Sequence, residues 1–188
     1  MLLRPQWQWR VVTLCRASDP DRAPRFLRAV KRLGASGAMA DLDDAPEQVP
    51  LPQQEVENTV TSLLQGREYD LILTHGPQGE YSRHRRHEEA SKAVCALWAN
   101  QRIAACNIWL FAYEDGGGEY LPRAIAGAHR NEKLPEQVWR EKYRTMTEVY
   151  GFAEDSFEAN ATPREEAFWC FDSPGAVRRW LQNRGIER

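Results

Sequence analysis

The chain passes from a strand to a helix through residues 70–89, which read DLILTHGPQGEYSRHRRHEE. Residues 70–73 form a short apolar run that predicts a buried strand, and a helical pattern follows residue 87. Gly76, Pro77 and Gly79 predict a loop between the two elements. Three of the four histidines therefore lie where a strand is followed by a helix, which is where α/β sheets place their chemistry.

His84 and His87 are spaced i, i+3 at the start of that helix, so both imidazoles can face one point. Neutral imidazole is a metal ligand, and charged imidazole is a proton donor. With Glu80 nearby to orient one ring, the pair suits a metal-assisted hydrolase. An H-x-x-H pair alone supplies two of the three protein ligands that a catalytic zinc needs. A solvated polar loop that binds nothing is the alternative.

The full string H-G-x-x-G-E-Y-x-x-H-x-x-H, from His75 to His87, resembles the LmbE-like, or PIG-L, family of zinc-dependent N-acetylglucosaminyl deacetylases. The resemblance continues less sharply through residues 109–115 and 150–157. It implies that His87 ligates zinc and that His84 is the acid or oxyanion partner in the reaction. His75 is expected to hold its loop through backbone hydrogen bonds. Like Glu80, it is also expected to contact a metal-ligating residue rather than the metal itself.

The chain departs from the family pattern in two places. Many members read G-E-Y-G-H-P-D-H, whereas this chain has one extra residue and has Arg85 and Arg86 in place of Pro-Asp. In the family, an A-H-P-D-D motif on the first strand supplies two more zinc ligands and the base, and nothing here matches it. The resemblance therefore implies a domain that lacks its first strand, with Met1 an internal methionine. Made from Met1, the chain is expected to be inactive.

The composition is that of an ordinary globular protein, and 188 residues predict a single domain over 1–188. A formal charge of −2 gives no reason to expect nucleic acid or an anionic membrane as a partner. No apolar run approaches the ~20 residues of a membrane span. The four cysteines form no C-x-x-C pair, which argues against a thiolate zinc site and a disulfide framework and favours the reducing cytoplasm.

Strand and helix patterns alternate through residue 112. Strands are expected over residues 9–15, 35–42, 69–73 and 108–112, and helices over the segment of Phe26, Val30 and Leu33 and over residues 53–65 and 88–101. This alternation predicts a Rossmann-like α/β fold, a mostly parallel sheet with helices on both faces. Beyond residue 112, helices are expected over residues 135–150 and 174–182 and a strand over residues 167–171.

Polar residues at other strand ends are candidates for substrate binding. Arg16 and Arg22 lie on the loop after the first strand, which faces the site, so they are expected to bind a sugar hydroxyl or a phosphate; free solvation is the alternative. Asp43 and Asp44 follow another strand and could hydrogen-bond a sugar, or could serve a turn.

Three weaker interpretations concern other polar residues. Asp19 or Asp21 could replace a missing ligand or base, although Asp-Pro-Asp is more often turn chemistry. His129 has no partner in view and is interpreted as a surface residue. The three arginines between residues 83 and 86 either lower the pKa of the histidines, attract an anionic substrate, or are solvated.

Three functional hypotheses follow. The first is a zinc-dependent deacetylase that acts on a small amidated sugar or sugar conjugate. The second is a non-catalytic sugar-binding protein with the same fold. The third is a nucleotide-binding α/β protein in which the glycines at residues 116–118 cradle a phosphate, although they open no recognisable helix.

Overall fold

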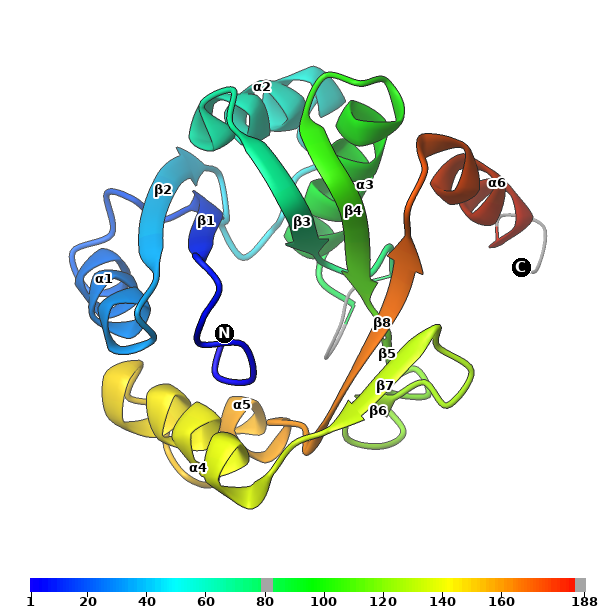
Figure 1. Cartoon of the computed structure of the whole chain (residues 1–188). Helices are drawn as coiled ribbons and strands as arrows, with labels where there is room; N and C mark the ends of the chain where they lie inside the picture. Colours follow the sequence, from blue (N-terminus) through cyan, green and yellow to red (C-terminus); the bar gives the residue numbers. More distant parts are fainter. Residues whose placement is uncertain (79–82, 185–188) are drawn as a thin grey trace.

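The computed structural model describes residues 1–78 and 83–184, and the strands of these residues form three sheets (Figure 1). β1 (Arg10–Cys15) and β2 (Ser36–Leu42) pair in parallel. β5 (Tyr113–Glu114) and β6 (Arg123–Ala124) form a short antiparallel pair. The largest sheet contains, in spatial order, β3 (Glu68–Thr74), β4 (Ala104–Phe111), β8 (Glu165–Phe171) and β7 (Arg130–Lys133).

Whether two neighbouring strands are parallel or antiparallel depends on how the chain connects them. β3 and β4 are parallel, whereas β8 is antiparallel to both β4 and β7. The parallel pairs β1–β2 and β3–β4 are each joined by a helix, as a crossover connection requires. The expected Rossmann-like α/β fold is confirmed. The sheet is parallel where strands and helices alternate and antiparallel after residue 112, where that alternation ends.

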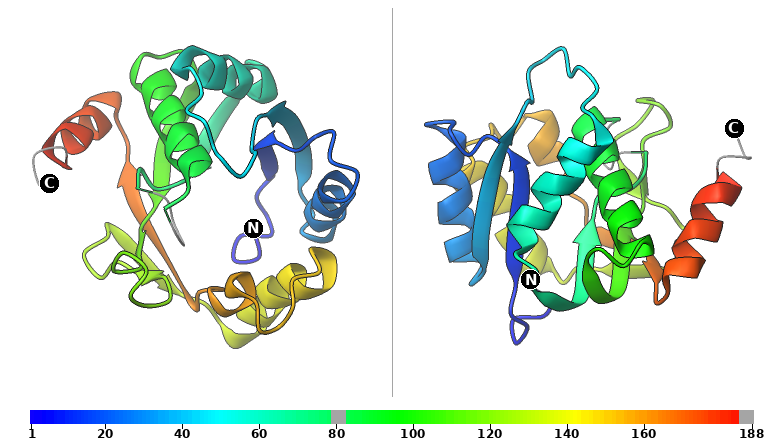
Figure 2. Two further views of the ribbon diagram at one scale, coloured as in Figure 1. Left: turned by 180° about the vertical axis from the view of Figure 1, so that it is seen from behind. Right: turned by 90° about the horizontal axis from the view of Figure 1, so that it is seen from above.

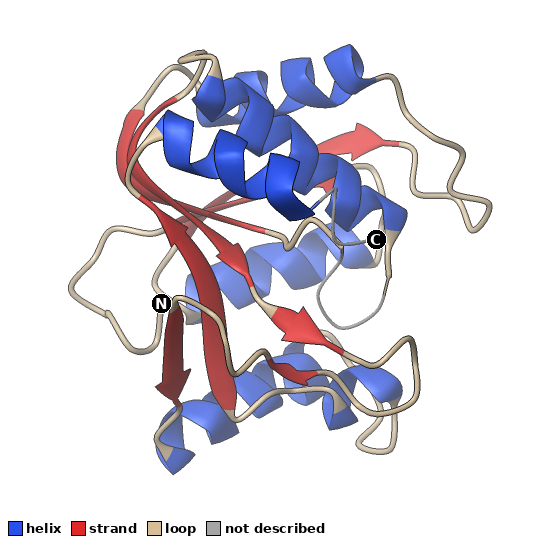
Figure 3. Cartoon of the chain, turned by 90° about the vertical axis from the view of Figure 1, so that its right-hand side faces the viewer, coloured by secondary structure: helices blue, strands red, loops and turns tan. Residues whose placement is uncertain are grey.

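Helices lie on both sides of the strands, as Figure 3 shows. The helices are α1 (Arg22–Arg32), α2 (Gln53–Leu64), α3 (Arg85–Ala99), α4 (Glu136–Arg144), the π-helix η1 (Thr145–Val149), α5 (Phe157–Asn160) and α6 (Pro174–Arg184). Gly37 of β2 contacts α1, whereas Leu42 packs on the core beneath α2. Val12 of β1 pairs with Ala38, next to Gly37, and also packs on that core. Adjacent positions of a strand point to opposite faces, so α1 and α2 cover opposite faces of β1 and β2 (Figure 2).

The main core lies between β3, β4 and β8 and the helices α2, α3 and α6. Ile108 and Leu110 of β4 are fully buried and pack with Leu97 of α3 and Val177 of α6. The intervening Trp109 points to the other face, where Arg130 lies over its ring at 5.1 Å. This period of two places the apolar side of the strand under the helices.

The two larger sheets are not joined to each other. Among the described residues, no backbone pairing connects β1 to β3, although α2 packs against both β1 and α3. Residues 43–52 connect β2 to α2. This connection passes near the carboxyl ends of β1 and β3 (Figure 1). Within the described part of the chain, none of the helices combines the length and apolar character needed to cross a bilayer.

Candidate functional site

The histidines gather where β3 ends and α3 begins. His75 follows Thr74, the last residue of β3, and His84 is the N-cap of α3 with extended backbone angles of φ −123° and ψ 120°. The carbonyl oxygen of His84 accepts the backbone N–H of His87 at 3.1 Å, which fixes the first turn. The i, i+3 spacing therefore puts His84 and His87 on the same side of the helix start, as the sequence predicts.

The three imidazoles form one cluster. The ring centroids of His75 and His87 are 3.9 Å apart with planes inclined by 7°, and those of His84 and His87 are 4.5 Å apart with planes inclined by 31°. His75 therefore stands directly against the predicted metal ligand rather than only shaping its loop. Glu80, predicted to orient one ring, lies outside the described residues.

Burial keeps His87 uncharged. Desolvation, helped by the neighbouring His75 and His84, lowers the pKa of His87 to about 3, so the ring is neutral at pH 7 and is in the form that ligates metals. A lowered pKa caused by the nearby arginines was one of three alternatives in the sequence, but the shift comes from burial and from the other histidines. Arg83 pairs with Glu88 at 2.8 Å.

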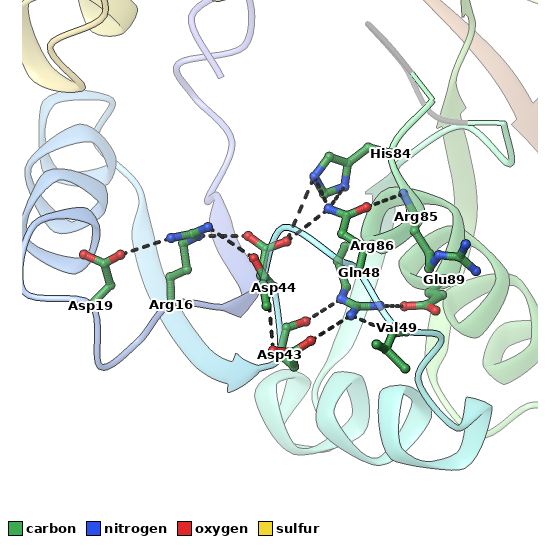
Figure 4. A network of polar contacts seen from close by, with 11 residues as sticks. Arg16, Asp19, Asp43, Asp44, Gln48, Val49, His84, Arg85, Arg86 and Glu89 are labelled. Carbon is green, nitrogen blue, oxygen red and sulfur yellow. Dashed lines mark hydrogen bonds and ion pairs between the residues drawn. The ribbon is translucent and has the colours of Figure 1, made fainter.

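A loop from β2 covers the histidines and is defined here as the strap, residues 43–51. Gln48 in the strap contacts His84, with 2.7 Å between the Gln48 amide nitrogen and His84 Nε2, and Asp44 Oδ1 lies 4.0 Å from the same ring nitrogen (Figure 4). Gln48 has a φ of +43°, a left-handed angle that is uncommon outside glycine. Backbone strain of this kind concentrates at functional sites.

Arg86 fastens the strap to α3. Its side chain is 6% exposed and donates to the carbonyl oxygens of Asp43 and Val49, to Asp43 Oδ2 at 3.2 Å and to Glu89 Oε2 at 2.6 Å (Figure 4). Glu89 in turn accepts the backbone N–H of Leu51 at 3.0 Å. Because its donors are used in this way, Arg86 is a structural residue rather than part of an open cationic patch.

Arg16 and Asp43, two of the predicted substrate-binding residues, do lie beside the site. Arg16 Nε donates to Asp44 Oδ2 at 2.8 Å, and its Nη1 donates to Asp19 Oδ2 at 3.2 Å. Asp43 is bound to Arg86 as described. The third, Arg22, belongs to α1 and lies over the ring of Phe152 at 5.2 Å, so the structure does not bring it to the histidines.

The remaining sequence candidates have local roles. Asp19 Oδ1 accepts the backbone N–H groups of Asp21 and Arg22 at the start of α1, and these bonds lower the pKa of its carboxyl. Asp21 pairs with Arg25 of the same helix at 2.7 Å. Both contacts fit the turn chemistry expected of Asp-Pro-Asp. His129 is exposed but accepts the backbone N–H of Cys170 at 3.0 Å, so it has a partner that the sequence did not reveal.

The glycines at residues 116–118 form the turn between β5 and β6. All three have positive φ, and Gly118 N donates to the carbonyl of Asp115 at 3.1 Å. They open no helix, so the contact that a phosphate-binding loop would make with a helix N-terminus is not formed at this turn.

Imidazole nitrogens suit zinc, but His75 and His87 are not arranged to share one ion. A zinc–nitrogen bond of about 2.1 Å lies near the plane of the imidazole. The planes of His75 and His87 are nearly parallel, so no ion lies in both. Among the residues that the structure describes, no three His, Cys, Asp or Glu side chains are placed to hold a metal ion. At most one of His75 and His87 can therefore ligate a given ion.

Gln48 and Asp44 are the site residues that sequence reasoning missed in their present roles. Asp44 was predicted to hydrogen-bond a sugar or to serve a turn. In the structure it pairs with Arg16, and its Oδ1 lies 4.0 Å from His84 Nε2. Gln48 had no signal beyond its place in a loop rich in Asp and Pro. Its contact with His84 joins residues 36 positions apart.

Comparison with known proteins identifies the fold but not the family. No model of a protein family matches the chain, and no curated protein matches its sequence. Among solved structures, the chain is similar to GalB, the 4-carboxy-2-hydroxymuconate hydratase of Pseudomonas putida, with a TM-score of 0.59 and 13% identity. The match covers 89% of this chain and 85% of the hydratase. At this identity, the likeness shows the shared fold alone.

Proposed function

We propose that the chain carries the histidine part of a zinc-dependent deacetylase site, in which the N-acetyl amide of an N-acetylglucosamine-type sugar is hydrolysed. The observation that carries the proposal is the imidazole cluster at the carboxyl end of β3, in which burial keeps His87 neutral. In an α/β sheet, ligands bind outside this end of the strands. A fold shared with a hydratase, an enzyme that uses water as a reactant, is compatible with this chemistry.

The groups of the chain itself have distinct roles in this proposal. His87 is the zinc donor, and since one donor does not retain zinc at low concentration, tight binding needs donors beyond the described residues. His84, whose side chain is 35% exposed, offers a proton or a hydrogen bond to the amide under attack. Arg16 and Asp43 lie at the rim of the site, and in this proposal they bind sugar hydroxyls.

Zinc binding tests the role of His87. With zinc in large excess, mass action offsets weak binding, so the thermal midpoint of the wild-type chain is expected to rise. The rise should vanish in His87→Ala and persist in His84→Ala. His129→Ala, which alters a histidine on the other side of β8, is the matched control and should respond like the wild type. An equal rise in all four proteins would show that zinc binds elsewhere.

Acetate release from N-acetylglucosamine, measured in the same zinc excess, tests the reaction. The chain is expected to be inactive without added zinc. In zinc excess a low wild-type rate is expected, and His84→Ala should lower it by about 10²-fold while zinc still binds. Hydrolysis that is indifferent to zinc or to His84 would contradict the proposal.

A non-catalytic sugar-binding protein is the second candidate. It is favoured by a surface cavity of about 480 Å³ beside α6, where Trp109 and Trp180 lie near Asp172 and Arg179. Aromatic faces with a few polar groups suit a sugar ring. N-acetylglucosamine that binds equally to wild type, His84→Ala and His87→Ala, without acetate release, would favour this candidate.

A further inference from the structure

β1 has a strand partner on one side only. The carbonyl oxygen of Trp9, directly before β1, accepts the backbone N–H of Ser36 of β2 at 2.9 Å, so the backbone of Trp9 faces β2. Successive residues of a strand direct their backbone groups to opposite sides. The N–H and C=O groups of Arg10 and Val12 therefore point away from β2, toward the side where β3 lies (Figure 1).

β3 presents a similar edge from the other direction. Asn107 Nδ2 of β4 donates to the carbonyl oxygen of Asp70 at 3.2 Å, so the backbone of Asp70 faces β4. By the same alternation, the backbone groups of Tyr69, Leu71 and Leu73 point away from β4, toward β1. Within residues 1–78 and 83–184, no backbone pairing joins these two edges. Two strand edges therefore face each other without a strand between them.

Both strands are apolar on both faces but are incompletely buried. β1 reads RVVTLC, and residues 71–73 of β3 read LIL, a pattern typical of parallel strands that are covered on both faces. All of β1 and these three residues of β3 are only half-buried. Ile108 and Leu110 of β4, which has a strand on each side, are 0% exposed. β1 and β3 differ from β4 in lacking a strand on the side where they face each other.

The outer edge of the larger sheet is protected in a way that these two edges are not. β7 is the strand beyond β8 and reads RNEK, and charged side chains of this kind prevent an edge strand from pairing with another chain. Residues 11–14 of β1 and 71–73 of β3 carry no charge. Their free N–H and C=O groups are matched by the backbone of another extended segment, which satisfies both donors and acceptors. The chemistry of the two edges thus specifies a strand as their occupant.

β1 and β3 are oriented so that one strand can pair with both. Arg16, directly after β1, donates to Asp44 Oδ2 at 2.8 Å, and Asp44 Oδ1 lies 4.0 Å from His84 Nε2 in the histidine cluster at the end of β3 (Figure 4). The carboxyl ends of the two strands therefore lie near each other. Val12 of β1 and Ile72 of β3 also pack on the same core beneath α2. A strand between them would continue this apolar layer under the helix.

We propose that the facing edges of β1 and β3 form a docking site for one extended segment of a partner polypeptide. The segment is as long as β1, six residues, and apolar on both faces. It forms backbone ladders with β1 and β3 together and so joins the two sheets into one. The proposal does not depend on the proposed deacetylase activity, because it uses backbone groups and apolar side chains rather than the histidines.

Hydrogen exchange of the wild-type chain with a synthetic peptide tests the docking site. The probe is a peptide of six valines and isoleucines, with two lysines at each end for solubility. With the peptide in excess, we expect the amides of Val12, Leu71 and Leu73 to exchange at least about tenfold more slowly. The amides of β7, whose edge is charged, are the internal control and should be unchanged. Protection of neither strand, of one strand alone, or of β7 to the same degree would overturn the proposal.

A second peptide separates strand pairing from apolar adsorption. It has the same sequence with every valine and isoleucine N-methylated, so it keeps the side chains but cannot donate backbone hydrogen bonds. It is expected to leave the exchange of Val12 and Leu71 unchanged, and equal protection by both peptides would contradict strand pairing. Light scattering of the chain alone should give the mass of a monomer. A dimer in which these amides are already slow without peptide would make a second copy the occupant and would overturn the proposal.

Discussion

Arg86 is the residue on which the strap depends most. Its buried guanidinium binds two strap carbonyls and two carboxylates, and removing it would leave Glu89 half-buried with one partner fewer. Breaking such a buried pair costs about 3 kcal/mol. We expect Arg86→Met to lower the free energy of unfolding, measured with denaturant, by about that amount.

Arg83→Met is the matched control for this prediction. Arg83 belongs to the same arginine-rich segment and pairs with Glu88, but its side chain is 75% exposed. An exposed ion pair contributes less than about 1 kcal/mol. Equal losses of stability in the two variants would contradict the structural role assigned to Arg86.

The residues of the site differ in how far the sequence predicts them. His84 and His87 could be predicted as neighbours because residues three apart share one side of a helix. The role of Gln48 could not be predicted, since its contact with His84 depends on how a loop rich in turn residues folds back across the sheet edge. The same holds for Arg86, which is buried only because the strap covers it.

The close packing of α1 against β2 can be tested with one substitution. A Cβ built on Gly37 would lie 2.7 Å from Phe26 Cε1 and 3.1 Å from Val30 Cγ2. Overpacking of this kind costs typically 1–3 kcal/mol. Gly37→Ala is therefore expected to lower the free energy of unfolding by about 2 kcal/mol.

Gly127→Ala is the control, because a Cβ on Gly127 would meet nothing within 4 Å. Its stability should match that of the wild type to within about 0.5 kcal/mol. A tolerated Gly37→Ala substitution would mean that α1 does not pack against β2 as closely as the structure shows.

Among the elements, those with strong local periodicity were predicted best. The helix expected over residues 53–65 is α2, and the strand expected over residues 35–42 is β2. The helix expected over residues 135–150 instead becomes a π-helix after Arg144, where the hydroxyls of Thr145 and Thr147 donate to carbonyls four residues back. β7 was missed because its residues are polar and its partner, β8, is distant in sequence.

At the scale of the whole molecule, the β1–β2 sheet and the β3–β4–β8–β7 sheet are held together without backbone hydrogen bonds between their strands. The strap and α2 join the sheets. Within residues 1–78 and 83–184, β1 has a ladder only with β2, and β3 only with β4. β4 is paired on both sides, with β3 and β8. An unpaired edge presents backbone N–H groups that can exchange with water or join another strand.

Hydrogen exchange should reveal this arrangement strand by strand. Successive residues of a strand direct their N–H groups to opposite sides, so each edge strand contains both laddered and unladdered amides. In β1 and β3, we expect the amides that make no hydrogen bond to a neighbouring strand to exchange at least about tenfold faster than the amides of β4. This corresponds to a difference of ~1.4 kcal/mol in opening free energy. The laddered amides of β1 and β3 are the internal control. Uniformly slow exchange along β1 would mean that another strand pairs with its inner edge in solution, because α2 alone covers side chains and leaves those N–H groups open to water.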